Sequence, residues 1–426
     1  MRKLANILLF LFVLTAALTI VNELQRPLFD LQFVSSLGQI SWLMCLATGT
    51  VVYIGLGFNR HLPKTILIPL FIWMAWRLLD YWPLENLAGD HYRLYAADAQ
   101  LILGLIVLKL NKVRNHKSIV LISNQFRGTA FSGRRFLAFC LISLPIIPIA
   151  LLLGSYSLVG QVIDDGTAGF VRLKPDGLYL TEKTYRQGEK QIRLTGMIHL
   201  GEENFYSGLI DSISGSRTLI LAEGVSDEKG LLRQRFSYGK IADILGLESQ
   251  EKISFPGRII ESFDEAEATQ PETPDILRAD IDLSQFDPRT LEVLDALAKY
   301  VLDSDSLVAG YAKFNRWAEE HVTNDINEIV MNDLVEKRNR SVLSYLPRAL
   351  EKYDTVIIPW GALHMKGIEE QVKKREFQLE KSLSRRSIDI WKLPYRKLLK
   401  SIMGTTDERE GRHTAGGRWN PPPTPN

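Results

Sequence analysis

Long apolar runs without a single charged residue fill much of the first part of this sequence. Three of them are long enough to cross a membrane as helices: Leu4 to Val21, Phe33 to Phe58 and Phe136 to Ile163. A helix of about 18 to 20 apolar residues spans the hydrocarbon layer of a bilayer, which is roughly 30 Å thick. Residues 1–163 therefore predict an α-helical membrane domain with several spans.

Two further runs are interrupted by charge. Thr65 to Trp82 contains Arg77 and Asp80 close to one end, where neighbouring aromatic side chains are typical of a membrane interface. The run from about 94 to 110 contains Asp98. Counting both gives five transmembrane helices, of which the fourth, at 94–110, is the weakest.

The loops between these runs predict an orientation, because Lys and Arg accumulate on the cytoplasmic side. The loop between the fourth and fifth runs holds six basic residues and no acid: Lys112, Arg114, Lys117, Arg127, Arg134 and Arg135. The alternate loops, 22–32 and 83–98, are richer in acids. With five spans the N-terminus is cytoplasmic and the chain after residue 163 lies outside the cytoplasm of an inner or plasma membrane. Without the fourth span it would lie inside.

Arg2 and Lys3 precede the first run, which lacks a small-residue cleavage site, so we expect an anchor that is retained.

Residues 164–400 have the mixed polar and apolar composition of a soluble domain that can bury its own core. The net charge of +2 gives no indication of nucleic acid as a partner. Both cysteines, Cys45 and Cys140, lie in apolar runs, so the soluble part has no disulfide and no thiolate metal site. The tail, 401–426, is rich in Gly, Pro and Thr and is predicted to be disordered.

Strand-like and helix-like patterns alternate along the soluble part. A strand at 191–199, a helix at 202–213 and a strand at 218–223 form one β-α-β passage, and a second runs through 354–364, 365–375 and 387–393. The middle, about 225 to 350, reads as mainly helical. This order predicts an α/β domain with an at least partly parallel sheet, whose ligands bind at the carboxyl ends of the strands.

Three candidate metal ligands fall at such strand ends. His199 and His364 each follow a glycine by three residues and come directly after an apolar strand, and Glu223 closes the strand that begins at Thr218. Two imidazoles and a carboxylate suit a catalytic divalent ion with one position open for water. The alternative is that both histidines are hydrogen-bonded structural residues and that Glu223 is solvated or caps a helix.

Arg338 is unusual because a 100° helical step places it on the apolar arc of a helix predicted over 325–346 and ended by Pro347, an arc that includes Met331. A guanidinium there either needs an anionic partner, and can then clamp an anionic group of a substrate, or it reaches past the rim of the core to water.

Asp280 and Asp282 face the same side if their segment is extended. They offer a ligand or a general base, but a solvated or capping role is favoured. His321 is expected at the surface.

The segments that carry these residues resemble the TraB/GumN/Tiki superfamily. They are Thr195-Gly-Met-Ile-His-Leu-Gly, Leu221-Ala-Glu-Gly-Val, Lys337-Arg-Asn-Arg and Trp360-Gly-Ala-Leu-His-Met-Lys-Gly-Ile, within residues 190–395. The resemblance implies that His199, His364, Glu223 and Arg338 are the motif residues. Members include divalent-metal-dependent peptidases and non-catalytic regulators. Trp360 and Met365 depart from the expected pattern, and the membrane part has no counterpart in the resemblance.

The leading hypothesis is a membrane-anchored metallohydrolase, in particular a peptidase acting on extracytoplasmic peptides or proteins. His199, Glu223 and His364 would hold Mn²⁺, Co²⁺ or Zn²⁺, with Arg338 orienting the substrate and Glu223 alternatively serving as general base. The competing hypothesis is a non-catalytic regulator or receptor that binds a peptide or small ligand in the same crevice. Transport is disfavoured, because the charged residues within the spans are few and peripheral.

Overall fold

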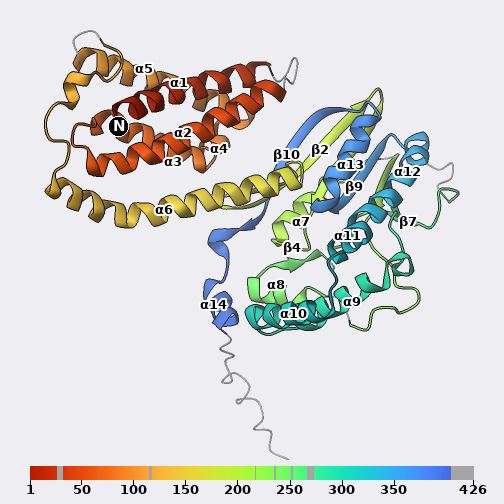
Figure 1. Cartoon of the computed structure of the whole chain (residues 1–426). Coiled ribbons are helices and arrows are strands. Elements are labelled where there is room, and N and C mark those ends of the chain that lie inside the picture. The colour runs from red at the N-terminus through yellow and green to blue at the C-terminus, as the bar shows by residue number, and fades with distance from the viewer. Residues whose placement is uncertain are drawn as a thin grey trace, which may run out of the picture. The chain divides into compact units, whose positions relative to one another are not determined.

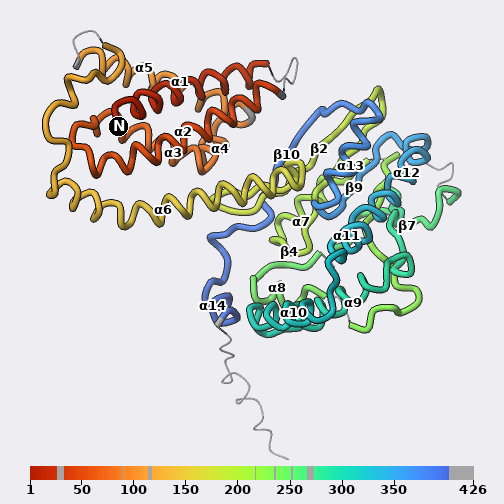
Figure 2. The backbone as a smooth tube through the Cα atoms, viewed as in Figure 1, coloured from red at the N-terminus to blue at the C-terminus, as the bar shows by residue number. Residues whose placement is uncertain are grey.

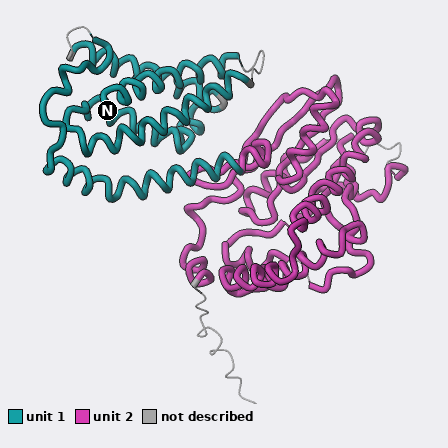
Figure 3. The backbone as a smooth tube through the Cα atoms, in the orientation of Figure 1, with its two compact units in different colours: residues 1–162 teal, residues 163–426 magenta. Residues whose placement is uncertain are grey.

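The structure is a computed structural model of the whole chain that describes residues 1–25, 32–114, 118–215, 217–234, 237–250, 253–265 and 273–403. The chain divides into two compact units, Met1–Val162 and Ile163–Asn426 (Figure 3). The tail predicted to be disordered lies outside the described residues from 404 onwards, and residues 401–403 form the end of a helix instead.

Unit 1 is built from helices. The long ones are α1 (Arg2–Gln25), α2 (Gln32–Phe58), α3 (Lys64–Leu78), α5 (Tyr92–Arg114) and α6 (Gly133–Gly166), whose last residues belong to unit 2, and the short α4 (Leu84–Ala88) lies between α3 and α5. Among the described residues, four helices are long and apolar enough to cross a membrane: α1, α2, α5 and α6.

The weak member of the predicted five is therefore the third span and not the fourth. α3 has 15 residues, or about 22 Å of helix at 1.5 Å per residue, which is less than the hydrocarbon thickness. It stops at Leu78, and the following turn contains two residues with positive φ, Asp80 and Tyr81. α5 instead extends beyond the predicted run and buries Gln100, which donates to the Phe12 carbonyl at 2.8 Å.

Successive long helices of unit 1 run in alternate directions (Figure 2). Asn6, near the start of α1, exchanges two hydrogen bonds with the backbone of Leu121, between α5 and α6. At the same end of the unit the Arg60 amide donates to the Ala130 carbonyl at 2.9 Å. Tyr53, five residues before the end of α2, has its hydroxyl 2.8 Å from that of Ser143 in α6. α6 therefore starts at the end where α1 starts and runs antiparallel to α2.

Unit 2 is built on an eight-stranded mixed sheet (Figure 1). Its order is β1-β2-β3-β9-β5-β8-β7, with β10 paired to the other edge of β2. The five strands from β3 to β7 are parallel, whereas β1, β2 and β10 pair antiparallel. The expected α/β architecture with a partly parallel sheet is confirmed.

The strands are β1 (Val171–Lys174), β2 (Gly177–Gln187), β3 (Lys190–Met197), β5 (Thr218–Ala222), β7 (Arg258–Ile260), β8 (Asp275–Arg278), β9 (Thr355–Gly361) and β10 (Gln378–Asp389), and a separate small ribbon pairs β4 (Leu200–Gly201) with β6 (Glu248–Ser249). The helices are α7 (Glu203–Ile210), α8 (Gly239–Leu245), α9 (Pro288–Leu297), α10 (Leu307–His321), α11 (Ile326–Met331), α12 (Arg338–Lys352), α13 (Ala362–Lys374) and α14 (Tyr395–Met403).

Alternation along the central strand β9 gives the sheet two apolar faces. Val356, Ile358 and Trp360 join one core cluster with residues of α12 and α13, such as Val342 and Ile368. Ile357 points to the opposite face, which also carries α7. A strand buried on both sides reads as a continuous apolar run, as this one does.

Two features of the middle segment differ from the prediction. β7 and β8 interrupt the region expected to be mainly helical, because strands of three and four residues are too short to show a periodicity. The helix expected to end at Pro347 continues to Lys352 with that proline inside it, and a π-helical segment, Asn332–Lys337, precedes α12.

Candidate functional site

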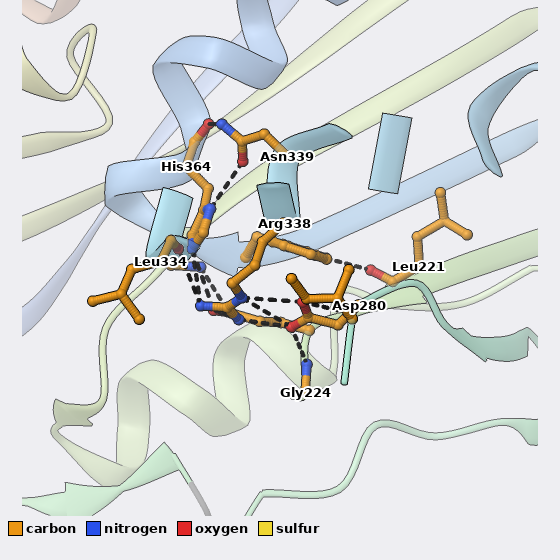
Figure 4. Close-up of polar contacts among 11 residues, drawn as sticks. Leu221, Gly224, Asp280, Leu334, Arg338, Asn339 and His364 are labelled. Atoms are coloured by element: carbon orange, nitrogen blue, oxygen red, sulfur yellow. Dashed lines mark hydrogen bonds and ion pairs between the residues drawn. The ribbon is translucent and has the colours of Figure 1, made fainter. Parts of the chain in front are cut away.

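Three side chains, Glu223, Asp280 and His364, surround the guanidinium of Arg338 (Figure 4), and we call the four residues together the Arg338 cluster. Arg338 Nη2 donates to Glu223 Oε1 at 2.8 Å and to Asp280 Oδ2 at 2.7 Å, and Nε donates to Asp280 Oδ1 at 3.0 Å. Nη1 lies 3.3 Å from His364 Nε2. These side chains are only 0 to 12% exposed.

The parallel strands bring these residues together. Glu223 directly follows β5, Asp280 comes two residues after β8, and His364 lies in the first turn of α13, which follows β9. β5 lies between β9 and β8, so the three carboxyl ends are neighbours at one edge of the sheet. Ligand sites of parallel sheets form at this edge.

The ladder between β5 and β9 stops at Ile220 and Ile357, before either strand ends. Pro359, two residues further, has no N–H to continue the ladder. The Leu221 carbonyl instead accepts a hydrogen bond from the Trp360 indole at 2.9 Å. The Gly361 amide then donates to Glu223 Oε2 at 2.6 Å. This hydrogen bond links the end of β9 to the residue that follows β5.

The hydrogen bonds of His364 define its tautomer. Nε2 faces Arg338 Nη1, a group that can only donate, so Nε2 presents its lone pair. Nδ1 lies 2.8 Å from Asn339 Oδ1 and therefore carries the proton, while Asn339 Nδ2 donates to the His364 carbonyl at 3.3 Å. His364 thus presents a neutral imidazole whose Nε2 lone pair is directed at Arg338.

Electrostatics favours the same protonation state. The pKa of His364 is lowered to about 4, chiefly by burial; Glu223 and Asp280 act to raise it, and Arg338 and His199 act to lower it. Burial also lowers the pKa of Arg338, but its hydrogen bonds to Asp280 and Glu223 outweigh burial and hold that pKa above its ordinary value. At neutral pH the site contains a cationic guanidinium and an uncharged imidazole.

The π-helical segment decides which face of the helix Arg338 occupies. A π turn inserts an extra residue and shifts the phase of the residues that follow. Met331, which a uniform 100° step placed beside Arg338 on the buried arc, is 51% exposed, whereas Val342 and Leu346 are buried as predicted. Arg338 does not reach past the rim of the core to water. It finds the anionic partners that its burial requires.

Of the three predicted metal ligands, the structure brings two together. Glu223 Oε1 lies 3.6 Å from His364 Nε2. His199 follows β3 as expected, but its ring stacks on Tyr238, with centroids 4.6 Å apart and planes 11° from parallel. In the part of the chain that the structure describes, no group of three or more His, Cys, Asp or Glu side chains is arranged to hold a metal ion.

The residues nevertheless fit a divalent ion in donor chemistry. A neutral Nε2 and a carboxylate oxygen are both ligands that such ions prefer. Two buried carboxyl groups face one guanidinium, so, with both ionised, the Arg338 cluster carries one negative charge that Arg338 does not balance. Glu223 and His364 would hold the ion. Because Nε2 of His364 has a single lone pair, Arg338 would then give up its contact with that nitrogen and keep its bonds to the carboxyl groups.

Asp280 differs from the favoured expectation. Its side chain is fully buried, binds Arg338 through both oxygens and accepts from the Gly224 and Ile281 amides. Its neighbour Asp282 is a cap, as expected: it accepts from the Ser284 amide at 2.9 Å. His321 is exposed at the end of α10.

Asn339 and Gly367 belong to the site, and sequence reasoning missed them. Asn339, 4% exposed, holds His364 by two hydrogen bonds. A Cβ on Gly367 would lie 2.7 Å from Asn339 Nδ2, so only glycine lets α13 approach α12 this closely. The sequence does place Asn339 directly after Arg338, and Gly367 three residues after His364. These two positions could have indicated a close contact between the helices that carry them. Trp360 and Met365 are both fully buried core residues.

Comparisons of the chain with described protein families, with curated proteins and with solved structures found no match.

Proposed function

We propose that this chain is a membrane-bound hydrolase, in particular a peptidase, and a member of the TraB/GumN/Tiki superfamily that its motifs resemble. The observation that carries the proposal is the Arg338 cluster: an arginine, two carboxyl groups and a neutral histidine, almost fully buried, at the carboxyl ends of three adjacent parallel strands. Perturbed titratable groups at such a position are a hallmark of reaction sites.

Each member of the cluster has a chemical role in this proposal. His364 Nε2 and Glu223 Oε1 present lone pairs 3.6 Å apart, where they can orient a water and accept its proton. Arg338 offers N–H donors to the oxygen on which negative charge develops. Asp280 positions Arg338, and Asn339 positions His364. A divalent ion bound by Glu223 and His364, with His199 as the third ligand that the resemblance implies, would acidify that water.

The second candidate is a non-catalytic regulator or receptor that binds a peptide or small ligand in the same crevice. One observation favours it: Arg338 already contacts both carboxyl groups and the histidine, so the cluster is internally satisfied. A binding site needs only the surrounding crevice, whereas catalysis needs Arg338 to exchange some of these contacts for substrate.

Metal content and peptide cleavage distinguish the two. The purified full-length protein is expected to bind Mn²⁺, Co²⁺ or Zn²⁺ and to cleave members of a peptide library, and His364→Ala should abolish both. His321→Ala, at an exposed histidine, is the matched control and should behave as the wild type. A protein that binds no divalent metal and whose cleavage is unchanged by His199→Ala and His364→Ala would refute the metallohydrolase. Peptide binding without turnover would favour the regulator.

We further propose that unit 1 crosses the membrane five times, with α3 and the turn after it as a short span. Support comes from the alternating helix directions, which place the starts of α1 and α6 at the same end of unit 1. Five basic residues that the structure describes lie at that end: Arg60, Lys64, Lys112, Arg134 and Arg135. By the positive-inside rule this end is cytoplasmic, and α6 then leads unit 2 into the extracytoplasmic space.

A topology reporter tests the orientation. Alkaline phosphatase fused after Ile163 should be active, because it folds only outside the cytoplasm, and a fusion after Asn59, between α2 and α3, should be inactive. A reporter after Ile163 that is active only when cytoplasmic would overturn the five-span arrangement and would place the hydrolase among cytoplasmic substrates.

A further inference from the structure

The last described helix of unit 2, α14, presents an apolar stripe to solvent together with the short turn before it. The stripe consists of Trp391, Tyr395, Leu399 and Ile402, which are 71%, 45%, 53% and 42% exposed. From Tyr395 to Ile402 their spacing of four and three residues places them on one side of the helix. Large apolar side chains exposed side by side in this way mark an interaction surface.

The opposite side of α14 attaches the helix to unit 2, so the exposed stripe is not the result of a detached helix. Ser401 is buried, and its hydroxyl donates to the Asp305 carbonyl at 3.3 Å. At the preceding turn the Tyr395 hydroxyl donates to the Ile390 carbonyl at 2.6 Å. The helix is therefore held with the α14 stripe facing outward.

The charged residues of α14 itself are all basic, whereas Lys392 in the turn before it pairs with Glu202 and Asp389, each at 3.7 Å. Residues 391–403 include Lys392, Arg396, Lys397 and Lys400 and no acid. Aromatic residues at the level of lipid headgroups, with Lys and Arg beside them, are typical of helices that lie in the membrane interface. Each basic residue near an anionic membrane contributes about 1 kcal/mol to the attraction.

Unit 2 follows the last candidate membrane span closely along the chain. α6, with an uninterrupted apolar sequence from Phe136 to Ile163, ends at Gly166, and β1 begins only five residues later at Val171. A tether this short gives any membrane-binding surface of unit 2 a high effective concentration of lipid. A second copy of the chain is a poorer partner, because two such helices face to face would bring their cations together.

We propose that α14 is a second membrane contact, which inserts the α14 stripe into the headgroup region of anionic phospholipids and so restrains unit 2 against the bilayer. This contact is independent of the proposed hydrolysis and of the side of the membrane on which unit 2 lies. Its consequence is that unit 2, and the Arg338 cluster with it, is restrained in orientation relative to the bilayer surface.

A fluorescent probe at Leu399 tests the contact in the full-length protein. In a Cys45→Ala, Cys140→Ala background, Leu399→Cys is labelled with an environment-sensitive dye and reconstituted into vesicles that contain phosphatidylglycerol and lipids with a nitroxide near the headgroup. We expect strong quenching at Leu399. The matched control is the same dye at Leu379→Cys, which is 53% exposed at the opposite end of the preceding strand β10 and should remain unquenched.

Charge reversal tests the lipid specificity. The double substitution Arg396→Glu and Lys397→Glu should shift the equilibrium of α14 toward the free state by at least about tenfold. Vesicles of phosphatidylcholine without anionic lipid should cause a shift in the same direction. Equal quenching at Leu399 and Leu379 would overturn the proposal. So would dye burial that depends on protein concentration and not on nitroxide lipid, because a second copy would then cover the stripe.

Discussion

Replacing Arg338 with methionine is expected to destabilise unit 2 by about 3–5 kcal/mol, the usual cost of removing one partner from a buried ion pair. The reason is that Asp280, fully buried, and Glu223, 10% exposed, would keep their charge without the guanidinium that binds both. For a domain of this size the loss corresponds to a fall of about 10 °C in the melting temperature. Thermal unfolding of the purified protein in detergent measures it.

Arg340→Met is the matched control, because Arg340 lies two residues after Arg338 on the same helix and its side chain is exposed. It should change the melting temperature little. Adding Asp280→Asn to Arg338→Met should recover part of the lost stability, since it removes one of the two unpaired charges. An Arg338→Met protein that melts with the wild type would show that the ion pairs of the Arg338 cluster contribute nothing to the fold.

Glu223→Gln is expected to reduce peptide cleavage by about two to four orders of magnitude, the range that a general base contributes. The change keeps the size of the side chain and one oxygen for Arg338 or the Gly361 amide, but it removes the charge beside His364 Nε2. Because Asp280 still binds Arg338, the melting temperature should fall less than in Arg338→Met. Steady-state kinetics, with kcat and KM determined separately, measure the effect.

Asp280→Asn provides the contrast within the same cluster. Asp280 contacts Arg338 and backbone amides but is placed behind the guanidinium, so its loss should act on stability and on KM more than on kcat. A Glu223→Gln protein with unchanged kcat, or an Asp280→Asn protein with the larger loss of kcat, would show that the roles assigned to the two carboxyl groups are wrong.

The sequence was sufficient for features that depend on local pattern. Uncharged apolar runs must be helices in a membrane, because no other open structure satisfies the backbone there. The run of β9 and the residues directly after β5 and β9 were recognisable because a buried strand has a continuous apolar pattern. This is why the sequence predicts His199, Glu223 and His364 at one edge of the sheet, of which Glu223 and His364 lie together.

The short strand β8 and the π-helical segment were beyond such reasoning. A strand of four residues has no periodicity, and burial of Asp280 results only from its position between Arg338 and two backbone amides. The phase of α12 depends on the extra residue of a π turn, which no uniform helical step anticipates.

The sequence by itself determined the long apolar helices of unit 1, the α/β class of the following domain and the residue types at its strand ends, since each follows from the hydrophobic pattern along the chain. Only the tertiary structure decided that α3 is the short helix, that Asp280 and Asn339 join the site, and that Arg338 lies between Glu223 and His364 while His199 stacks on Tyr238. The physical reason is that a buried charge acquires its partners from segments far apart in sequence, and the packing of β5, β8, β9 and α12 chooses them.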